Sequence, residues 1–342
     1  MPYRNYEETE PYEKGFGAYY AEKIVPHLDA LFRSQSTTAK ALKARKRPAV
    51  LMTIAITMGG TAAFLLTPIF LPELSFHEIR PNRVGSGLGA LVASVWAWAK
   101  FPAIQYRKEA KQKVVSDTLI FFGFDHQRTE KSVFSEENLL MRTRMFPEIQ
   151  ADEIVLDDAL STVRNGHQVD VVEARLRFKS AIRVSPHVFT GLVIRVALNA
   201  GEFPDPIRIL PKGLEVIGGD ELFGTGRLDI PSDWMAGDYE VWGPEASLAE
   251  DSLIRSAMST VDSFLRARKF GKVRAAIYGQ HVYLALAQST DFFESLSSFR
   301  KSLSVNDVRR VVREAHIILD ILDRAIDELG LPREDLSQTV RQ

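Results

Sequence analysis

Two long apolar stretches, separated by a short polar connection, constrain this chain more than any other feature of its sequence. The first stretch, Ala49 to Leu71, has 23 residues and no charged side chain, and the second, Val84 to Ile104, has one, Lys100. At about 1.5 Å per residue, the first stretch would form a helix about 34 Å long, which exceeds a hydrocarbon core of about 30 Å. We therefore predict transmembrane helices over residues 49–71 and 84–104, joined by a loop over residues 72–83. The alternative, a pair of buried core helices, is disfavoured because core helices seldom run so far without a charge.

Basic residues flank the outer ends of both stretches. Five precede the first stretch and five flank or follow the end of the second: Lys40, Lys43, Arg45, Lys46 and Arg47, then Lys100, Arg107, Lys108, Lys111 and Lys113. The connection carries only Arg80 and Arg83 as cations. The positive-inside rule therefore places both termini in the cytoplasm. In a bacterium this is a multi-pass inner-membrane protein whose short loop faces the periplasm.

Small residues recur at four-residue spacing in both stretches: Ala55, Gly59 and Ala63, then Gly85, Gly89, Ala93 and Ala97. Such stripes let helix backbones approach closely in lipid. Packing of the hairpin against itself is the expected use, and packing between subunits is the alternative. Because neither stretch contains an acid or a histidine, an ion pathway built from these two helices alone is disfavoured.

Residues 1–47 form a cytoplasmic segment with one predicted amphipathic helix. The helix is expected from about Gly17 to Arg33, with Ile24, Val25, Leu28, Leu31 and Phe32 on its apolar face. The polar run Ser34 to Thr38 predicts a break in the helix before the basic flank. The apolar face is expected to pack on the cytoplasmic domain, with the membrane surface as the alternative.

Residues 105–342 predict a cytoplasmic α+β domain built from antiparallel hairpins. Asn165-Gly166 and Gly279-Gln280 each separate two runs of strand character, which is typical of tight hairpins. Further strands are expected over Val188 to Leu198 and Tyr239 to Trp242. Ser247 and Glu250 fit a capping box before an amphipathic helix that ends near Gly271, and a terminal helix is expected from Asn306 to Leu329.

In this order the chain resembles a bacterial family known only as domain of unknown function 3137. The resemblance rests on the amphipathic N-terminal helix, the membrane hairpin and the following segments: Leu119 to Phe124, Met145-Phe146-Pro147, Leu156 to Leu176, Tyr239 to Trp242, the helix after it, the Gly279 hairpin, and Asp291 to Glu294. It departs from the family pattern at Trp242 to Glu245, where a tyrosine, an alanine and two acids are expected. The resemblance implies an inner-membrane protein and supplies no active site.

Residue types with catalytic chemistry form no recognisable motif. The chain has no cysteine, so thiolate chemistry and disulfides are excluded. The seven histidines show no metal-ligand spacing: His27, His77, His126, His167, His187, His281 and His316. His167 and Asp170 are expected to be solvated strand residues. The acid pairs Asp157-Asp158 and Asp220-Glu221 are expected in solvated loops. We therefore predict no catalytic, cofactor-binding or metal-binding residue and no cofactor.

Two basic clusters have ordinary explanations. The residues flanking the apolar stretches act first as topology determinants and second as contacts for anionic lipid headgroups. The second cluster, Arg266, Arg268, Lys269, Lys272 and Arg274, complements a helix C-terminus. The net charge of −1 excludes a globally basic nucleic-acid binder.

These features predict a membrane-tethered interaction or scaffold module that is not an enzyme. Its expected partners are the lipid bilayer, anionic headgroups, and either a second copy of the chain or another membrane protein, with no nucleic acid. The alternatives are a membrane-anchored enzyme with an unrecognised active site and, least favoured, a subunit of an oligomeric pore or transporter.

Overall fold

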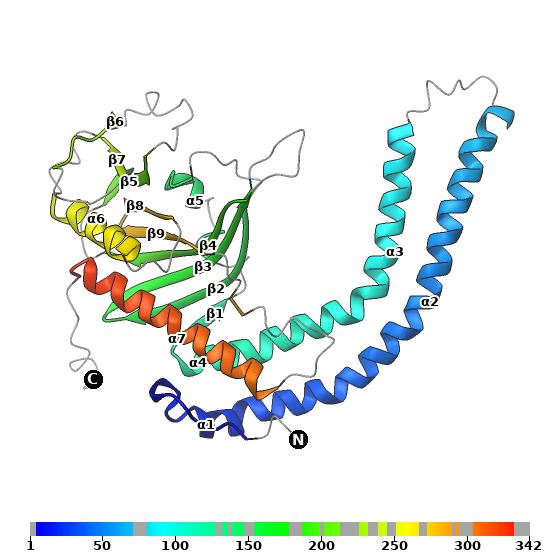
Figure 1. Cartoon of the computed structure of the whole chain (residues 1–342), viewed down its shortest axis with the longest axis horizontal. Coiled ribbons are helices and arrows are strands. Elements are labelled where there is room, and N and C mark those ends of the chain that lie inside the picture. The colour runs from blue at the N-terminus through cyan, green and yellow to red at the C-terminus, as the bar shows by residue number, and fades with distance from the viewer. Residues whose placement is uncertain are drawn as a thin grey trace. The chain divides into compact units, whose positions relative to one another are not determined.

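The computed structural model describes residues 5–70, 81–127, 132–135, 139–146, 154–177, 187–198, 202–212, 226–231, 239–244, 251–266, 272–288, 292–293 and 304–331. Side chains 64–70, 81–85, 107, 108, 110, 111, 127, 187, 188 and 251 are outside this description. The chain divides into two units, one comprising residues 1–117 with 295–308, the other 118–294 with 309–342. The predicted α+β class is confirmed, with long N-terminal helices and an antiparallel sheet (Figure 1).

The first unit is dominated by two long helices that run side by side. Short helical segments come first: η1 (Pro11–Glu13), α1 (Phe16–Tyr19) and the π-helical η2 (Tyr20–Ile24). They lead into α2 (Val25–Phe70), whose 46 residues correspond to about 69 Å of helix. After α3 (Pro81–Ala110) follow η3 (Lys111–Val115) and α4 (Ser116–Phe121). Since α3 begins at Pro81, residues 81–83 belong to this helix and not to the predicted loop, whose residues 72–80 lie outside the described part.

The N-terminal residues fold around one buried carboxylate. Glu13 is fully buried and accepts hydrogen bonds from the Tyr6 hydroxyl at 2.7 Å and from the Thr9 backbone N–H at 2.6 Å. The rings of Phe16 and Tyr20 pack beside Tyr6, with centroids 4.8 and 5.2 Å from it. Burial raises the pKa of Glu13, but the hydrogen bonds together outweigh it and lower this pKa below the ordinary value.

The predicted break at Ser34 to Thr38 is wrong, because α2 continues through it without interruption. The hydroxyls there bond within the helix: Ser34 donates to the Leu31 carbonyl at 2.9 Å and Thr37 to the Ser34 carbonyl at 2.7 Å. Ser and Thr disfavour helix interiors when their hydroxyls bond backbone groups in non-helical conformations, but here the hydroxyls bond carbonyls of the preceding helical turn. The predicted cytoplasmic helix and the first apolar stretch are therefore parts of one helix.

The apolar face predicted for the N-terminal helix is buried in part, since Val25 is half-buried and Phe32 is 36% exposed. Ile24, Leu28 and Leu31 are buried. Two polar contacts join this region to the start of α4: the Tyr19 hydroxyl donates to the Asp117 carbonyl at 2.9 Å, and His27 Nε2 lies 2.9 Å from Asp117 Oδ2. These contacts tie the beginning of α2 to the end of the α3 arm.

The second unit contains a nine-stranded antiparallel sheet. Its strands are β1 (Asp125–Gln127), β2 (Ile154–Arg164), β3 (His167–Arg177), β4 (His187–Ala197), β5 (Phe203–Pro211), β6 (Gly226–Arg227), β7 (Tyr239–Gly243), β8 (Val273–Gly279) and β9 (His281–Ala287). The spatial order is β1-β2-β3-β4-β9-β8-β5-β7-β6. Consequently β8 and β9, which come late in the chain, lie between β4 and β5.

Both predicted hairpins are confirmed. Arg164 pairs with His167 across Asn165-Gly166, and these two turn residues have φ values of 51° and 85°. The backbone region of positive φ is the one that Asn and Gly tolerate best, so the sequence suits the turn. In the second hairpin Tyr278 pairs with His281, and Gly279 has φ 59°. The predicted strands at Val188 to Leu198 and Tyr239 to Trp242 are confirmed as β4 and β7.

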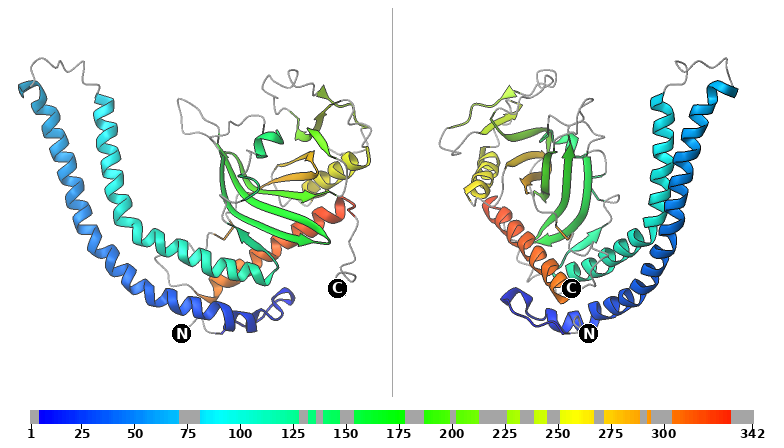
Figure 2. Two further views of the ribbon diagram at one scale, coloured as in Figure 1. Left: turned by 180° about the vertical axis from the view of Figure 1, so that it is seen from behind. Right: turned by 45° about the vertical axis from the view of Figure 1, so that its right-hand side comes forward.

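The three remaining helices lie on the two faces of the sheet. Helices α6 (Asp251–Arg266) and α7 (Val305–Glu328) pack against one face, as both views of Figure 2 show. Their buried apolar residues recur at helical spacing, for example Met258 and Val261 in α6 and Val312 and Ala315 in α7. The terminal helix is confirmed within a residue at each end. The predicted capping box and Gly271 lie outside the described residues.

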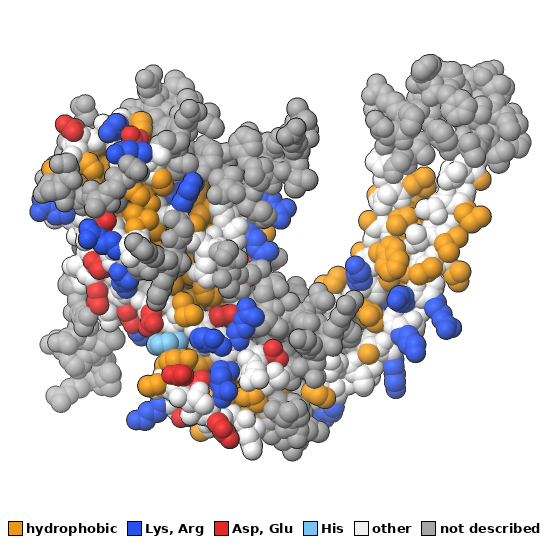
Figure 3. Space-filling view, viewed as in Figure 1, with side chains coloured by type: hydrophobic (Ala, Val, Ile, Leu, Met, Phe, Trp, Pro, Cys, Tyr) orange, Lys and Arg blue, Asp and Glu red, His pale blue; other side chains and the backbone are white. Residues whose placement is uncertain are grey.

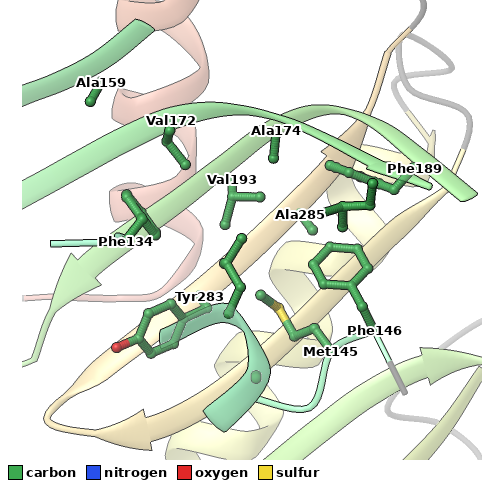
Figure 4. Packing of buried hydrophobic residues seen from close by; sticks show 13 residues of the cluster. Phe134, Met145, Phe146, Ala159, Val172, Ala174, Phe189, Val193, Tyr283 and Ala285 are labelled. Carbon is green, nitrogen blue, oxygen red and sulfur yellow. The ribbon is translucent and has the colours of Figure 1, made fainter. Parts of the chain in front are cut away.

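The opposite face is covered around α5 (Leu139–Arg142) by an apolar cluster (Figure 4). Phe134, Met145 and Phe146 approach the strands, where Val172 and Val193 point toward them. In β4, only glycine fits at Gly191, because a Cβ there would lie 2.1 Å from the Leu286 carbonyl oxygen. This cluster is the main core of that face of the sheet.

Candidate functional site

The α2–α3 pair is held together by small and aromatic residues on one stripe of each helix. Ala49, Ala99, Ala103 and Tyr106 are buried. At Gly60 a Cβ would lie 2.5 Å from Leu88 Cδ2, so this side chain of α3 packs directly on the backbone of α2 there. The rest of the surface of both helices lies outside this stripe of contacts and is exposed.

That remaining surface is apolar. Most of the exposed large hydrophobic residues of the described chain fall here: Val50, Leu51, Met52, Ile54, Met58, Leu91, Trp98, Phe101 and Ile104. Leu51 and Met58 are 67% and 68% exposed. Figure 3 shows these hydrophobic side chains along the two helices, with Lys and Arg side chains gathered where the apolar cover ends. Large contiguous apolar surfaces of this kind mark contact with a membrane or a partner.

One helix segment among the described residues is long and apolar enough to cross a membrane, Ser86–Tyr106 with 21 residues. It coincides with the second predicted crossing. The first predicted crossing, residues 49–71, lies in α2 up to Phe70, but the side chains beyond residue 63 are outside the described part. A crossing by this first helix therefore stays a prediction.

The predicted use of the small-residue stripes within the hairpin is wrong where the structure describes them. Ala55, Gly59, Gly89 and Ala93 are exposed, and a Cβ at Gly59 or Gly89 would meet nothing within 4 Å. The four-residue spacing is therefore present on the outer side of the pair. The contact with α3 uses Gly60, one position away.

The base of the hairpin is closed by one cationic side chain. Pro102 lies inside α3 and has no N–H to donate to the Trp98 carbonyl four residues earlier. Arg45 of α2 supplies that donor, with its guanidinium nitrogen 3.2 Å from the Trp98 oxygen. The same guanidinium lies over the Trp98 ring, 5.1 Å from its centroid. We call this arrangement of Arg45, Trp98 and Pro102 the clasp.

Exposed cations surround the clasp. Lys40, Lys43, Lys46, Arg47 and Lys100 are exposed, and within the described residues none of them pairs with a carboxylate. The sequence explains this, since no Asp or Glu occurs between Asp29 and Glu73 or between Glu78 and Glu109. Lys113, further along the second helical arm, differs because it pairs with Glu109 at 2.7 Å. We call the five unpaired residues the cationic collar.

A second candidate site is a row of polar side chains across four strands of the sheet. Asp170 accepts hydrogen bonds from the Ser161 hydroxyl at 2.8 Å and from Arg195 at 3.3 Å. Arg195 also reaches His281 Nε2 at 2.6 Å. These residues come from β2, β3, β4 and β9, and the register places Asp170 opposite Arg195. The sheet therefore assembles a cluster that sequence spacing alone does not reveal.

The electrostatics of this row favour a neutral histidine. Burial, with a further contribution from the nearby Arg195 charge, lowers the pKa of His281 to about 4. His281 is then an acceptor toward Arg195 at neutral pH, and its other ring nitrogen carries the proton. The Ser161 hydroxyl bonds to Asp170 and the His281 ring bonds to Arg195, so the contacts within this row include no hydroxyl–imidazole pair of the kind that acyl transfer uses.

The prediction that His167 and Asp170 are solvated is wrong. His167 is 1% exposed and Asp170 is 8% exposed, because β3 is covered on both faces. His167 Nδ1 lies 3.2 Å from the Ala197 carbonyl oxygen. The loop prediction for Asp157-Asp158 is also wrong: both lie in β2 at an irregularity of the ladder, and Asp158 is buried.

The other histidines are dispersed. His126 Nε2 lies 3.5 Å from Asp158 Oδ1, and His316 is partly buried, 3.7 Å from Asp320. His77 and the side chain of His187 lie outside the described residues. Across the described ranges, no group of three or more His, Asp or Glu side chains is arranged to hold a metal ion.

The second basic cluster does not form one patch. Arg274 is buried, donates to the Met145 carbonyl at 2.9 Å and stacks over the Phe146 ring at 4.9 Å. Arg266, in the last turn of α6, pairs with Asp262. Arg268, Lys269 and the acid pair Asp220-Glu221 lie outside the described residues. Arg274 thus serves the core of the sheet and not the end of α6.

Comparisons with known proteins give a family of unknown function. Residues 187–325, from β4 into α7, match the family described as "Protein of unknown function (DUF3137)". A solved structure, the mycobacterial trehalose monomycolate transport factor A, TtfA, aligns with a TM-score of 0.32 and 12% identity, over 62% of this chain and 95% of that one. No curated protein sequence matches the chain. The resemblance to domain of unknown function 3137 is thereby confirmed over residues 187–325.

Proposed function

We propose that this chain is a two-pass protein of the bacterial inner membrane that presents its α+β domain in the cytoplasm as a non-enzymatic interaction module. The observation that carries the proposal is the exposed apolar cover of the α2–α3 pair, bounded by the cationic collar. Exposed residues such as Leu51 and Met58 would be costly in water, at about 25 cal/mol per Å² of apolar surface, but are stable in lipid.

The hydroxyls of the two helices support an anchor and not a pore lining. Thr53 donates to the Ala49 carbonyl at 2.8 Å, Thr57 to the Thr53 carbonyl at 2.9 Å, and Ser94 to the Ala90 carbonyl at 2.9 Å. A hydroxyl that bonds its own helix is satisfied without water, as a lipid-facing position requires.

Cysteine accessibility tests the topology cleanly because the chain has no native cysteine. Ser75→Cys lies in the connection between the stretches and Ser36→Cys lies in the cytoplasmic part of α2. In spheroplasts a membrane-impermeant maleimide should label S75C, whereas S36C should react only after permeabilisation. Equal labelling of both variants in intact spheroplasts would overturn the two-pass arrangement, and recovery of the chain in the soluble fraction would overturn the anchor.

The interaction role has its own test. Full-length chain extracted in mild detergent should either self-associate in analytical ultracentrifugation or retain the same protein partner in independent purifications. A monomer without a reproducible partner contradicts the module, while the anchor stays unaffected.

A further inference from the structure

We propose that the cationic collar is a binding surface for the phosphate headgroups of anionic phospholipids. The inference rests on the proposed membrane anchoring and adds a lipid class to it. Its starting point is that Lys40, Lys43, Lys46, Arg47 and Lys100 are exposed and, among the described residues, unpaired. A group of cations left without carboxylates is available for an external anion.

The collar residues of α2 share one side of the helix. Lys40, Lys43 and Arg47 follow each other at intervals of three and four residues, which places neighbouring side chains on the same face. Lys46 lies beside them. Their long side chains therefore extend from one side of α2, where they can reach headgroups around the helix.

The clasp places the collar at the membrane boundary. Because Arg45 contacts Trp98, the collar residue Lys46 of α2 and Lys100 of α3 lie at similar heights along the hairpin. At about 1.5 Å per residue, Lys46 and Lys43 lie about 5 and 9 Å beyond Ala49, where the first uncharged stretch begins. The headgroup layer extends about 5–8 Å beyond the hydrocarbon on each side. Lys46 thus lies within this layer, Lys43 at its outer edge, and Lys40, about 14 Å beyond Ala49, outside it.

Aromatic and apolar residues of α3 lie along the same part of the hairpin as the collar. Trp98 is 43% exposed, and Phe101 and Ile104 are 50% and 51% exposed. Tryptophan prefers the interface between hydrocarbon and headgroups, and long cationic side chains extend from it toward the phosphates. A soluble phosphate compound would not explain apolar side chains exposed among the cations, so the observations favour a lipid surface.

Quenching by brominated lipids measures which headgroups gather beside Trp96 and Trp98, the two tryptophans of α3. The full-length protein, with Trp234→Phe and Trp242→Phe to remove distant fluorescence, is reconstituted into phosphatidylcholine vesicles. A fixed fraction of lipid is replaced by brominated phosphatidylglycerol or by brominated phosphatidylcholine. We expect the anionic quencher to be about two-fold or more as effective as the neutral one, with the ratio falling toward one in high salt.

Two variants with the same charge change distinguish the collar from overall charge. The collar variant carries K40Q, K43Q, K46Q and K100Q, and the control carries K14Q, R177Q, K272Q and R313Q at exposed positions elsewhere. The collar variant should lose the preference for the anionic quencher and the control should keep it.

The outcomes separate the two proposals. Equal quenching by both lipids in the parent protein overturns the collar proposal but leaves the anchor intact. Weak quenching by both lipids shows that the tryptophans are not at a bilayer, and this overturns the anchor itself. The collar variant gives the third test, provided that quenching by the neutral lipid shows it to be inserted. If it keeps the preference for the anionic quencher, other residues cause that preference and the proposal is overturned.

Discussion

The clasp at the base of the hairpin makes a quantitative prediction. Arg45→Gln removes the cation over the Trp98 ring, and its side chain ends two bonds short of the guanidinium nitrogen that donates to the Trp98 carbonyl. The carbonyl then has no partner, because Pro102 cannot supply the usual N–H. Pro102→Ala restores that N–H, so Arg45 should matter less in this second background.

The magnitude follows from the two contacts. Leaving a carbonyl without a partner costs about 1–3 kcal/mol, and an exposed cation–π contact contributes about 0.5–1 kcal/mol. Because Trp98 is 43% exposed, partial access by water puts both at the low end. We expect Arg45→Gln to destabilise the hairpin by about 1–2 kcal/mol. Only the carbonyl contribution depends on Pro102, which gives a coupling energy of about 1 kcal/mol.

The assay is a double-mutant cycle on purified full-length protein. The parent chain, R45Q, P102A and the double variant are unfolded with dodecyl sulfate in mixed micelles and followed by tryptophan fluorescence. The cycle cancels the large gain in helix propensity that P102A brings by itself. Lys46→Gln is the matched control, since this neighbouring residue is exposed and outside the clasp; its effect should stay within about 0.5 kcal/mol.

Additivity would refute the reasoning. If the effects of R45Q and P102A add within about 0.3–0.5 kcal/mol, Arg45 does not compensate for the missing N–H. A loss in R45Q no larger than that in K46Q would show that the cation–π contact is also without consequence.

Three further predictions concern other parts of the chain. Gly60→Val should weaken the α2–α3 pair by about 1–3 kcal/mol in the same unfolding assay, because its Cβ meets Leu88, whereas Gly59→Val, which meets nothing, should not; equal effects contradict the contact. Because the pKa of Glu13 is lowered in the folded chain, its ionised carboxylate stabilises the fold above pH 4.5, and this stability is lost as the pH falls through the lowered pKa. Limited proteolysis of the N-terminus should therefore increase only in acid for the parent chain, and at every pH for Glu13→Gln. The pKa of His281 is about 4 in the folded chain and 6.5 ordinarily, so the unfolded chain binds the proton first and the free energy of unfolding should fall as the pH drops from 6.5 to 4. In denaturant titrations, His281→Gln should make the free energy of unfolding less dependent on pH over this range.

Local chemistry was sufficient for the elements whose signals lie within a few residues. The Asn165-Gly166 and Gly279-Gln280 turns were predictable because Asn165, Gly166 and Gly279 adopt the positive φ that Asn and Gly tolerate better than other residue types. The terminal helix was predictable because its apolar residues recur every three or four positions. The apolar stretches and their basic flanks were equally predictable, because the length of a stretch and the charges beside it are read directly from the sequence.

The clasp and the polar row could not be predicted in this way. Arg45 and Trp98 are 53 residues apart, and Asp170 and His281 are separated by more than a hundred. Pro102 within a predicted helix does indicate that the Trp98 carbonyl lacks its usual N–H donor. No sequence feature near Pro102 indicates that Arg45 supplies the replacement donor. The insertion of β8 and β9 between β4 and β5 brings His281 to Arg195, and this order depends on long-range pairing.

The sequence alone therefore determined the type and extent of most helices and strands, the two tight turns, and the presence of an apolar hairpin with cationic ends. Tertiary structure decided which side of each element is buried. Ser34 and Thr37 stay helical because their hydroxyls bond the preceding turn, Gly60 and not Gly59 meets the neighbouring helix, and His167 is covered although polar residues surround it in sequence. The physical reason is that propensity and periodicity act over one or two turns, whereas burial is set by what packs against an element from elsewhere in the chain.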